Sequence, residues 1–241
     1  MVVDVGKSRG NGPTGSGSGQ SVWLRRPPAP RQEPPLTRER ITEAAIALLD
    51  EEGIERLTMR HLAERMGIGA TTLYWHIDTK DDVVDLATDA IFAEAPLPDG
   101  HDGTWQESVV ALLSGCRSML LRHPWSAALP LRQRPSIGPN FLTWLELLQA
   151  TLSRAGCGAQ QTQAVCWLLY NHVLGSAASQ SNFQWSKAER VAAQQQLRME
   201  VDKYPTLVAY EYPLDEDWEA NFRLGVQLVL AGLESQLSAA D

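Results

Sequence analysis

Side chains able to bind nucleic-acid bases and phosphates gather within residues 57–82, LTMRHLAERMGIGATTLYWHIDTKDD. Arginine can pair with guanine, small hydroxyl residues allow close approach to base edges, and aromatic rings can touch thymine methyl groups. The candidate DNA contacts are Thr58, Arg60, Ala70, Thr71, Thr72, Tyr74, Trp75, His76 and Lys80. Of these, Arg60, Thr71 and Thr72 are expected to read bases. His76 and Lys80 are expected to contact phosphates.

Two short helices joined by a tight turn must position these side chains. Thr58 can accept a backbone hydrogen bond as the first N-cap, and Gly67 can adopt the left-handed conformation that ends a helix. Leu73 and Ile77, four residues apart, can anchor the second helix inward, and Thr79 can cap a further helix. The pattern predicts a helix-turn-helix. The alternative is an ordinary helical hairpin with a glycine corner, whose aromatic pair after Leu73 packs into the core.

An apolar stripe at helical spacing precedes this pair and predicts a first helix that ends at Gly53. The stripe consists of Ile41, Ala44, Ala45, Leu48 and Leu49. Together with that helix, the segments TRERI, LTMRHLAERMGI and TTLYWHIDTKDDVVDL resemble the N-terminal domain of the TetR family of bacterial transcriptional repressors, and LYWH is similar to the tetracycline repressor branch. The resemblance implies a homodimer that binds a palindromic operator and is released by a small molecule.

Helical periodicity continues through the rest of the chain, and no strand pattern occurs in the sequence. The expected helices cover residues 80–94, 105–122, 140–155, 160–178, 187–200 and 218–237, with a loop or short helix at 126–139 and a mobile segment at 204–215. The predicted fold is all-α. It has a disordered leader rich in Gly, Ser and Pro at 1–36, a three-helix DNA-binding domain at 37–82, and a larger helical ligand-binding and dimerisation domain at 83–241.

The net charge of −8 divides unevenly along the chain. Residues 1–80 carry 11 Lys and Arg against 10 Asp and Glu, whereas residues 81–241 carry 10 against 19. An N-terminal part close to neutrality can approach phosphate while an acidic remainder is repelled by it. Arg25, Arg26 and Arg31 make the leader either a basic arm on DNA or a solvated tail.

The sequence contains no pattern of an enzyme, a metal centre or a membrane protein. It has no HExxH, GxSxG or phosphate loop, and its five histidines lack metal-ligand spacing, so we expect no catalytic residue, metal or cofactor. No apolar run reaches eighteen residues, and the N-terminus has no signal core. Cys116, Cys157 and Cys166 are odd in number and lack CxxC spacing, which favours a reduced, cytoplasmic bacterial protein.

Six tryptophans lie beyond residue 100, where large aromatic side chains either line an apolar pocket or fill the core. The resemblance to tetracycline repressors makes Leu112, Cys116, Arg134, Trp144, Trp167 and Asn171 the ligand-binding candidates. Where that branch offers two histidines and a glutamate toward a drug–magnesium complex, this chain has Pro96, Pro130 and Ser179. Since proline has no metal-binding side-chain atom, we expect an apolar or aromatic effector that binds without metal, and not tetracycline.

Two long helices carry broad apolar faces that either fill the domain's own core or join two copies of the chain. These faces are Ala164, Leu168, Asn171 and Gly175 in one helix, and Phe222, Val226, Val229 and Leu233 in the other. The resemblance implies a four-helix dimer interface between them. We therefore expect a ligand-responsive homodimeric repressor that is not an enzyme. The alternatives are a DNA-binding regulator without a small-molecule ligand, and a helical ligand-binding or enzymatic protein whose helix-turn-helix is vestigial.

Overall fold

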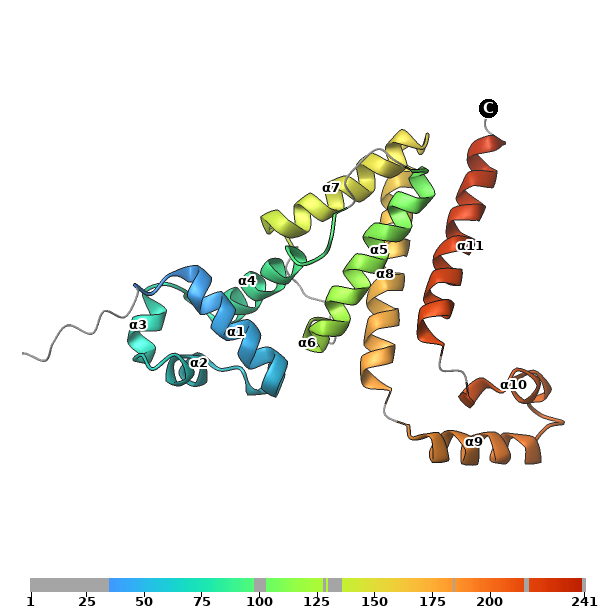
Figure 1. The fold of residues 1–241 in the computed structure, drawn as a ribbon, viewed down its shortest axis with the longest axis horizontal. Helices are drawn as coiled ribbons and strands as arrows, with labels where there is room; N and C mark the ends of the chain where they lie inside the picture. Colours follow the sequence, from blue (N-terminus) through green and yellow to red (C-terminus); the bar gives the residue numbers. More distant parts are fainter. Residues whose placement is uncertain are drawn as a thin grey trace, which may run out of the picture. The chain divides into compact units, whose positions relative to one another are not determined.

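The computed structural model describes residues 35–97, 103–127, 129, 136–183, 185–214 and 217–239. Within these ranges every regular element is a helix, as Figure 1 shows, and the all-α prediction is confirmed. The elements are α1 (Arg38–Glu52), η2 (Ile54–Arg56), α2 (Met59–Arg65), α3 (Ala70–Tyr74), α4 (Lys80–Phe92), α5 (Trp105–Arg122), α6 (Pro124–Ala127), α7 (Pro139–Arg154), α8 (Ala159–Asn182), α9 (Lys187–Met199), α10 (Pro205–Ala209), η3 (Tyr212–Leu214) and α11 (Trp218–Ser238).

The helices of the N-terminal part begin and end at the residues that the sequence indicated. The Thr58 hydroxyl accepts a hydrogen bond from the backbone three residues later at 3.1 Å and so caps α2. Gly53 and Gly67 have φ angles of 79° and 69°, in the left-handed region that favours glycine. At the start of α4, Thr79 and Asp82 form a reciprocal capping box, in which the carboxylate accepts from Thr79 N at 3.0 Å. The turns around α2 and α3 are therefore encoded locally.

The apolar faces of α1 to α4 form one core. Its side chains that are at most 1% exposed include Ile41, Ala45, Leu48, Leu49, Leu62, Leu73, Val83 and Ala87. Because α1 packs against α4 as well as α2, the start of α4 belongs to this core. The domain boundary that the sequence suggested between residues 82 and 83 falls inside α4, which runs on without a break.

The C-terminal part is built around α5 and α8, which pack against each other. In Figure 1, α7 and α11 lie on either side of this pair, and both contact it. The guanidinium of Arg117 on α5 is 4% exposed, and it donates to Glu219 on α11 at 2.6 Å and to Ser176 on α8 at 3.0 Å. A buried charge needs such partners to offset its desolvation, so Arg117 specifies how these three helices meet.

The structure corrects the face predicted for the last helix. Phe222, Val226 and Leu233 are buried and Val229 is half-buried, because this side of α11 packs against α5 and α8 of the same chain. The exposed apolar side chains of α11 are Leu224 and Leu228, at 54% and 66% exposure. On α8, by contrast, the predicted face is exposed, and Leu168 on that face is 53% exposed.

In the segment at 204–215, for which the sequence predicts mobility, the described residues include α10 and η3, which pack against α9. The predicted loop at 126–139 is described only in part, and α6 ends within it. The leader at 1–36, with Arg25, Arg26 and Arg31, lies almost wholly outside the described residues. Among the helices that the structure describes, none is long and apolar enough to cross a membrane.

Candidate nucleic-acid interface and effector region

The short helix α3 presents the candidate base-reading side chains to solvent. Leu73 and Ile77 are 0% and 4% exposed and hold the helix against the core, as their spacing predicted. Thr71 and Thr72 are exposed in its first turn, after the N-cap residue Gly69, and Ala70 between them and the cap is half-buried. A small, exposed first turn is the part of a recognition helix that approaches base edges.

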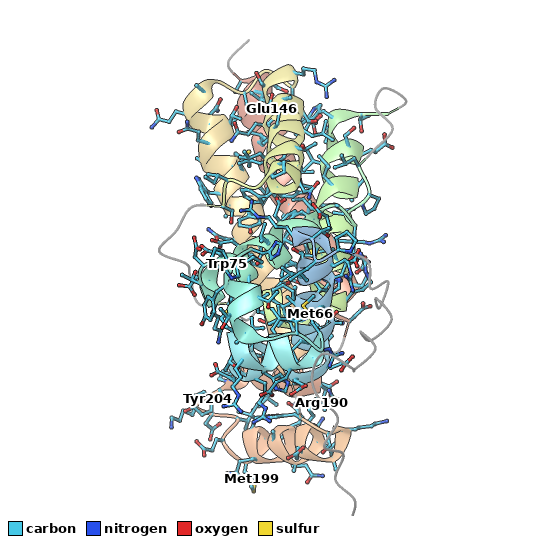
Figure 2. All side chains as sticks on the ribbon, turned by 90° about the vertical axis from the view of Figure 1, so that its left-hand side faces the viewer. Met66, Trp75, Glu146, Arg190, Met199 and Tyr204 are labelled. Atoms are coloured by element: carbon cyan, nitrogen blue, oxygen red, sulfur yellow. The ribbon has the colours of Figure 1, made fainter. Side chains whose placement is uncertain are left out.

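The aromatic pair after Leu73 points outward. Tyr74 is 49% exposed, and Trp75, labelled in Figure 2, is 84% exposed. The alternative in which these rings fill the core is therefore wrong. Large aromatic side chains at such exposure are available to a partner, so the structure leaves both as DNA-contact candidates.

Arg60 on α2 lies at the surface and is held loosely. Its Nε donates to Glu64 at 2.8 Å, and its side chain is 85% exposed. A pair this exposed is strongly screened by solvent and contributes little, so guanine can compete with Glu64 for the guanidinium. Thr58, also exposed, uses its hydroxyl to cap α2, which makes it a positioning residue within this surface.

Lys80 is engaged in a contact that the sequence did not reveal. Its ammonium donates to the Ile54 carbonyl in η2 at 3.1 Å, and its side chain is half-buried. Lys80 therefore ties the start of α4 to the turn between α1 and α2. His76, the other predicted phosphate contact, is half-buried just after α3. The phosphate role of both residues remains a prediction.

Ion pairs set the position of α2 on α1. Arg65 donates to Glu51 at 2.5 Å, and His61 lies 3.0 Å from Glu52. The hydrogen bond from Arg65 holds the pKa of Glu51 below its ordinary value, and the contact with His61 does the same for the pKa of Glu52. These residues were not among the sequence candidates. The signal was present in the acidic end of α1 and the basic residues of α2.

Three of the ligand candidates come together in the core of the C-terminal part. Leu112 and Cys116 are fully buried and Trp144 is 1% exposed, with its Nε1 donating to the Leu112 carbonyl at 3.4 Å. The ring of Tyr170 lies 5.8 Å from that of Trp144. Burial raises the pKa of Cys116 to about 12, so this thiol is an apolar lining group and not a nucleophile.

Tyr170 itself is the polar group of this cluster. Within the described part of the chain, no hydrogen bond to its hydroxyl is found. Burial, and then the nearby Cys116, raise the pKa of Tyr170 above its ordinary value. Tyr170 is half-buried and its hydroxyl is not among the buried polar atoms that lack a partner, so the hydroxyl reaches solvent and is available to a ligand acceptor.

The remaining ligand candidates do not lie inside that cluster. Trp167 is 61% exposed on α8, with its ring centroid 6.2 Å from that of Tyr170, and Asn171 is exposed on the same side of the helix. Arg134 and Pro130 lie outside the described residues. Trp167 thus joins the buried aromatic cluster to the exposed face of α8.

A hollow of about 550 Å³ lies between α5 and α11. Its lining includes Val110, Ala111, Ser114, Leu230 and Ala231. None of the five described ligand candidates lines it. The hollow is an open surface groove, whereas the candidate residues gather on the other side of α5, toward α7 and α8, so we do not assign the effector to it.

Asp89 on α4 caps the N-terminal end of another helix, α7, and the sequence analysis missed this contact. Its Oδ1 accepts from the backbone of Asn140 and Phe141 at 3.0 Å each, at the start of α7. The N-cap residue of α7 is Gly138, which has no side chain to do this. A Cβ at Gly138 would stand 2.2 Å from Oδ1 of Asp89, so the glycine makes room for the carboxylate.

The residues at the positions of metal-directed groups do not form a metal site. Pro96 has no donor atom in its side chain, and Ser179 is exposed on α8. Across the described ranges, no group of three His, Cys, Asp or Glu side chains is placed to hold a metal ion.

A helix-turn-helix with an exposed recognition helix, joined to a larger helical part, defines a DNA-binding transcriptional regulator. The family model "Bacterial regulatory proteins, tetR family" matches residues 41–87, and "Tetracyclin repressor-like, C-terminal domain" matches residues 97–237. The chain belongs to the TetR family of transcriptional regulators, and this family does not consist of enzymes.

Relatives and solved structures agree with this assignment. An HTH-type transcriptional regulator of Saccharopolyspora erythraea is 40% identical over 91% of this chain and 94% of the relative. The HTH-type transcriptional repressor DrrR1 of Streptomyces coeruleorubidus is 28% identical over 95% of this chain and 91% of its own. The structure is similar to that of the TetR family protein ActR from Streptomyces coelicolor in complex with actinorhodin, with a TM-score of 0.77, 29% identity, and 87% and 100% of the two chains covered.

Proposed function

We propose that this chain represses transcription by binding a pseudo-palindromic operator as a homodimer. The observation that carries the proposal is the exposure of Thr71, Thr72, Tyr74 and Trp75 on a helix whose Leu73 is fully buried. A helix held inward by its apolar residues and bare on its outer side is suited to enter a major groove.

The other DNA contacts are assigned around this helix. Arg60 would pair with guanine after leaving Glu64, and His76 and Lys80 would bind phosphates beside the recognition helix. The N-terminal end of α4, which starts at Lys80, adds a favourable helix dipole to the phosphate contact. We propose DNA binding for residues 37–82, to whose core the following turns of α4 also belong, and ligand binding and dimerisation for the remainder of 83–241.

The dimer interface is proposed on α8 and α11. Trp167 and Leu168 on α8 are 61% and 53% exposed, and Leu224 and Leu228 on α11 are 54% and 66% exposed. Four large apolar side chains at this exposure exceed what a monomer's surface needs, and pairing them with a second copy removes them from water. Two recognition helices are then available for two half-sites.

The effector site is proposed around Tyr170, between α5, α7 and α8. Leu112, Cys116 and Trp144 supply an apolar lining, Trp167 forms its outer edge, and the hydroxyl offers one polar contact. A small aromatic or apolar molecule suits such a lining. The similarity to ActR, solved with actinorhodin, supports a small-molecule effector for this fold. Arg134 and Asn171 remain further candidates.

The effector would act by population shift. It would favour a dimer whose recognition helices no longer match successive major grooves, because a ligand shifts an equilibrium only by its difference in affinity for the two states. Such a regulator works where its operator is, and we assign the protein to the bacterial cytoplasm.

A mobility-shift assay with full-length protein tests the proposal. DNA from upstream of the chain's own gene is compared with random DNA of equal length across a salt titration. We expect the upstream fragment to bind at least about a thousandfold more tightly. Equal affinity for both fragments would indicate a vestigial helix-turn-helix and would refute the repressor assignment. Specific binding that no small molecule releases would favour a regulator without an effector.

A further inference from the structure

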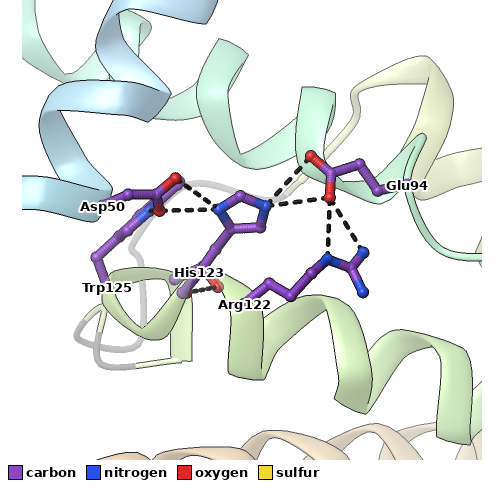
Figure 3. A network of polar contacts seen from close by, with 6 residues as sticks. Asp50, Glu94, Arg122, His123 and Trp125 are labelled. Atoms are coloured by element: carbon purple, nitrogen blue, oxygen red, sulfur yellow. Dashed lines mark hydrogen bonds and ion pairs between the residues drawn. The ribbon is translucent and has the colours of Figure 1, made fainter.

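His123 joins the N-terminal helices to the C-terminal part through two carboxylates, as Figure 3 shows. At the end of α5, its Nδ1 lies 2.8 and 3.0 Å from the two oxygens of Asp50 on α1. Its Nε2 lies 3.2 Å from both oxygens of Glu94, just after α4. The imidazole is 9% exposed. One side chain therefore contacts the first helix of the DNA-binding part and the last turn of α4.

All four of these contacts are satisfied when the imidazole carries a proton on each nitrogen. An ionised carboxylate only accepts hydrogen bonds, and neutral imidazole donates from one nitrogen only. A neutral His123 would turn a lone pair toward carboxylate oxygens at about 3 Å, which repels. The imidazolium donates to both Asp50 and Glu94 and satisfies every contact.

Neighbouring donors keep both carboxylates in the accepting form. Arg122 donates from Nη2 to Glu94 at 3.0 Å, and Trp125 on α6 donates from Nε1 to Asp50 at 2.7 Å. Burial alone would raise the pKa of Glu94, but its hydrogen bonds with His123 and Arg122 outweigh burial and leave that pKa below its ordinary value. The proton at this site therefore belongs on His123.

Three further carboxylates of the surrounding helices are engaged with other partners. On α1, Glu51 and Glu52 are engaged with α2, and Asp89 of α4 caps α7. The α8 helix, which packs against α6, carries no Asp, Glu, Lys or Arg, and its His172 contacts the Phe222 carbonyl. Within the described residues, the charge balance of this junction thus rests on Asp50, Glu94, Arg122 and His123.

We propose that the Asp50–His123–Glu94 contact is a proton-dependent latch, and that closing it raises the affinity for operator DNA. The inference rests on the proposed DNA binding. When the latch is closed, α1 and α4 hold the recognition helix in one position relative to the C-terminal part. Less conformational entropy is then lost when the two recognition helices of a dimer bind two half-sites. Because the closed latch holds one proton more than the open one, operator affinity rises as the pH falls.

Amide variants separate the proton from the contact. In Glu94→Gln, the new amide donates to Nε2 of a neutral His123, while Nδ1–H donates to Asp50, so the latch closes without a proton. Asp50→Asn achieves the same result from the other side. In His123→Gln, the side chain does not titrate and its single amide cannot reproduce both contacts.

The test measures operator affinity of the full-length protein between pH 5.5 and 8.5 at constant salt. As the pH rises, we expect the operator affinity of the wild type to fall more steeply than that of Glu94→Gln. The difference should reach up to about tenfold per pH unit, because one proton is linked to DNA binding. Any effect of pH that the two proteins share cancels in the difference. His123→Gln should bind more weakly than Glu94→Gln at every pH and share its shallow slope.

A second measurement needs no DNA. At a pH at which the operator affinities of wild type and Glu94→Gln differ, the ¹⁵N shifts of the His123 ring in the free protein should be those of an imidazolium in the wild type and those of a neutral ring in Glu94→Gln. A neutral His123 in the wild type, or equal pH slopes for wild type and Glu94→Gln, overturns the latch while leaving the repressor assignment intact. Absence of any sequence preference at every pH refutes the repressor assignment instead.

Discussion

Thr71 and Thr72 owe their exposure on the surface proposed to contact DNA to a turn that a few residues encode. Gly67 takes a left-handed conformation, and Leu73 anchors α3 in the core two residues after Thr71. Short side chains in the first turn then let the helix approach base edges closely. The chemistry at this surface is hydrogen bonding by small hydroxyls.

Thr71→Ala is expected to reduce the affinity for the operator by about 1–3 kcal/mol, because a base contact is lost. Binding to random DNA should change little. Thr143→Ala, an exposed threonine on α7, is the matched control and should leave both affinities unchanged. Operator affinity equal to wild type in a folded Thr71→Ala protein would contradict the assignment.

Lys80→Ala should weaken binding to all DNA sequences about equally and lower the slope of affinity against salt by about one unit, since one phosphate contact disappears. The same change removes the hydrogen bond to Ile54, so a modest loss of thermal stability is expected as well. Salt titration and thermal melting measure the two effects. A loss confined to one operator variant would argue for a base contact instead.

At the residue scale, the sequence predicted which side chains lie on the surface of α3, because the inward pair Leu73 and Ile77 leaves only one orientation for the rest. It did not predict the engagement of Lys80 by Ile54 or the cap that Asp89 supplies. Both contacts join residues more than 20 positions apart in the chain. Spacing along a helix carries no information about such pairs.

At the scale of elements, caps and glycines predicted the helix ends well. The assignment of α11 faces failed for a physical reason. Its Leu224 and Leu228 and its Phe222 and Val226 form two apolar sides, and either could face the core. Only the positions of α5 and α8, and the buried Arg117 that reaches Glu219, decide which side turns inward. The cluster around Tyr170 was predicted only in part for the same reason.

The cap from α4 to α7 can be tested by a double-mutant cycle. Asp89→Ala should lower the free energy of unfolding by about 1 kcal/mol, as the loss of an N-cap does. Gly138→Ala should cost about 1–3 kcal/mol, because the new Cβ would overlap the carboxylate. In the Asp89→Ala background, only the part of that second cost that comes from the carboxylate should vanish, because the Cβ of residue 89 would still stand 2.6 Å from the new one. Denaturant unfolding measures each value, and additive costs would contradict the cap.

At the scale of the whole molecule, the exposed leucines of α11 predict the assembly state. Leu228→Glu should dissociate the dimer, because each copy buries the side chain and then faces a charge. Because the interface is two-fold, the substitution occurs in it twice. The free energy of dimerisation should therefore weaken by at least about 3 kcal/mol, which is more than a hundredfold in dimer affinity. Analytical ultracentrifugation measures it, and operator binding should fall in parallel. Leu142→Glu, a 43% exposed leucine on α7, is the control and should remain dimeric.

The effector prediction depends on the same assembly, because Trp167 lies between the aromatic cluster and the face of α8. An aromatic molecule that occupies the site should quench tryptophan fluorescence and release the operator, and both effects should persist in EDTA, since Pro96 and Ser179 offer no metal-directed group.

Tyr170→Phe removes a hydroxyl without a partner in the described part of the chain, so the fold should not lose stability. Ligand affinity should fall severalfold to about tenfold, the worth of one hydrogen bond, whereas Tyr210→Phe, at an 80% exposed tyrosine, should change nothing. Operator release by tetracycline that requires magnesium and is abolished by EDTA would refute the metal-independent site.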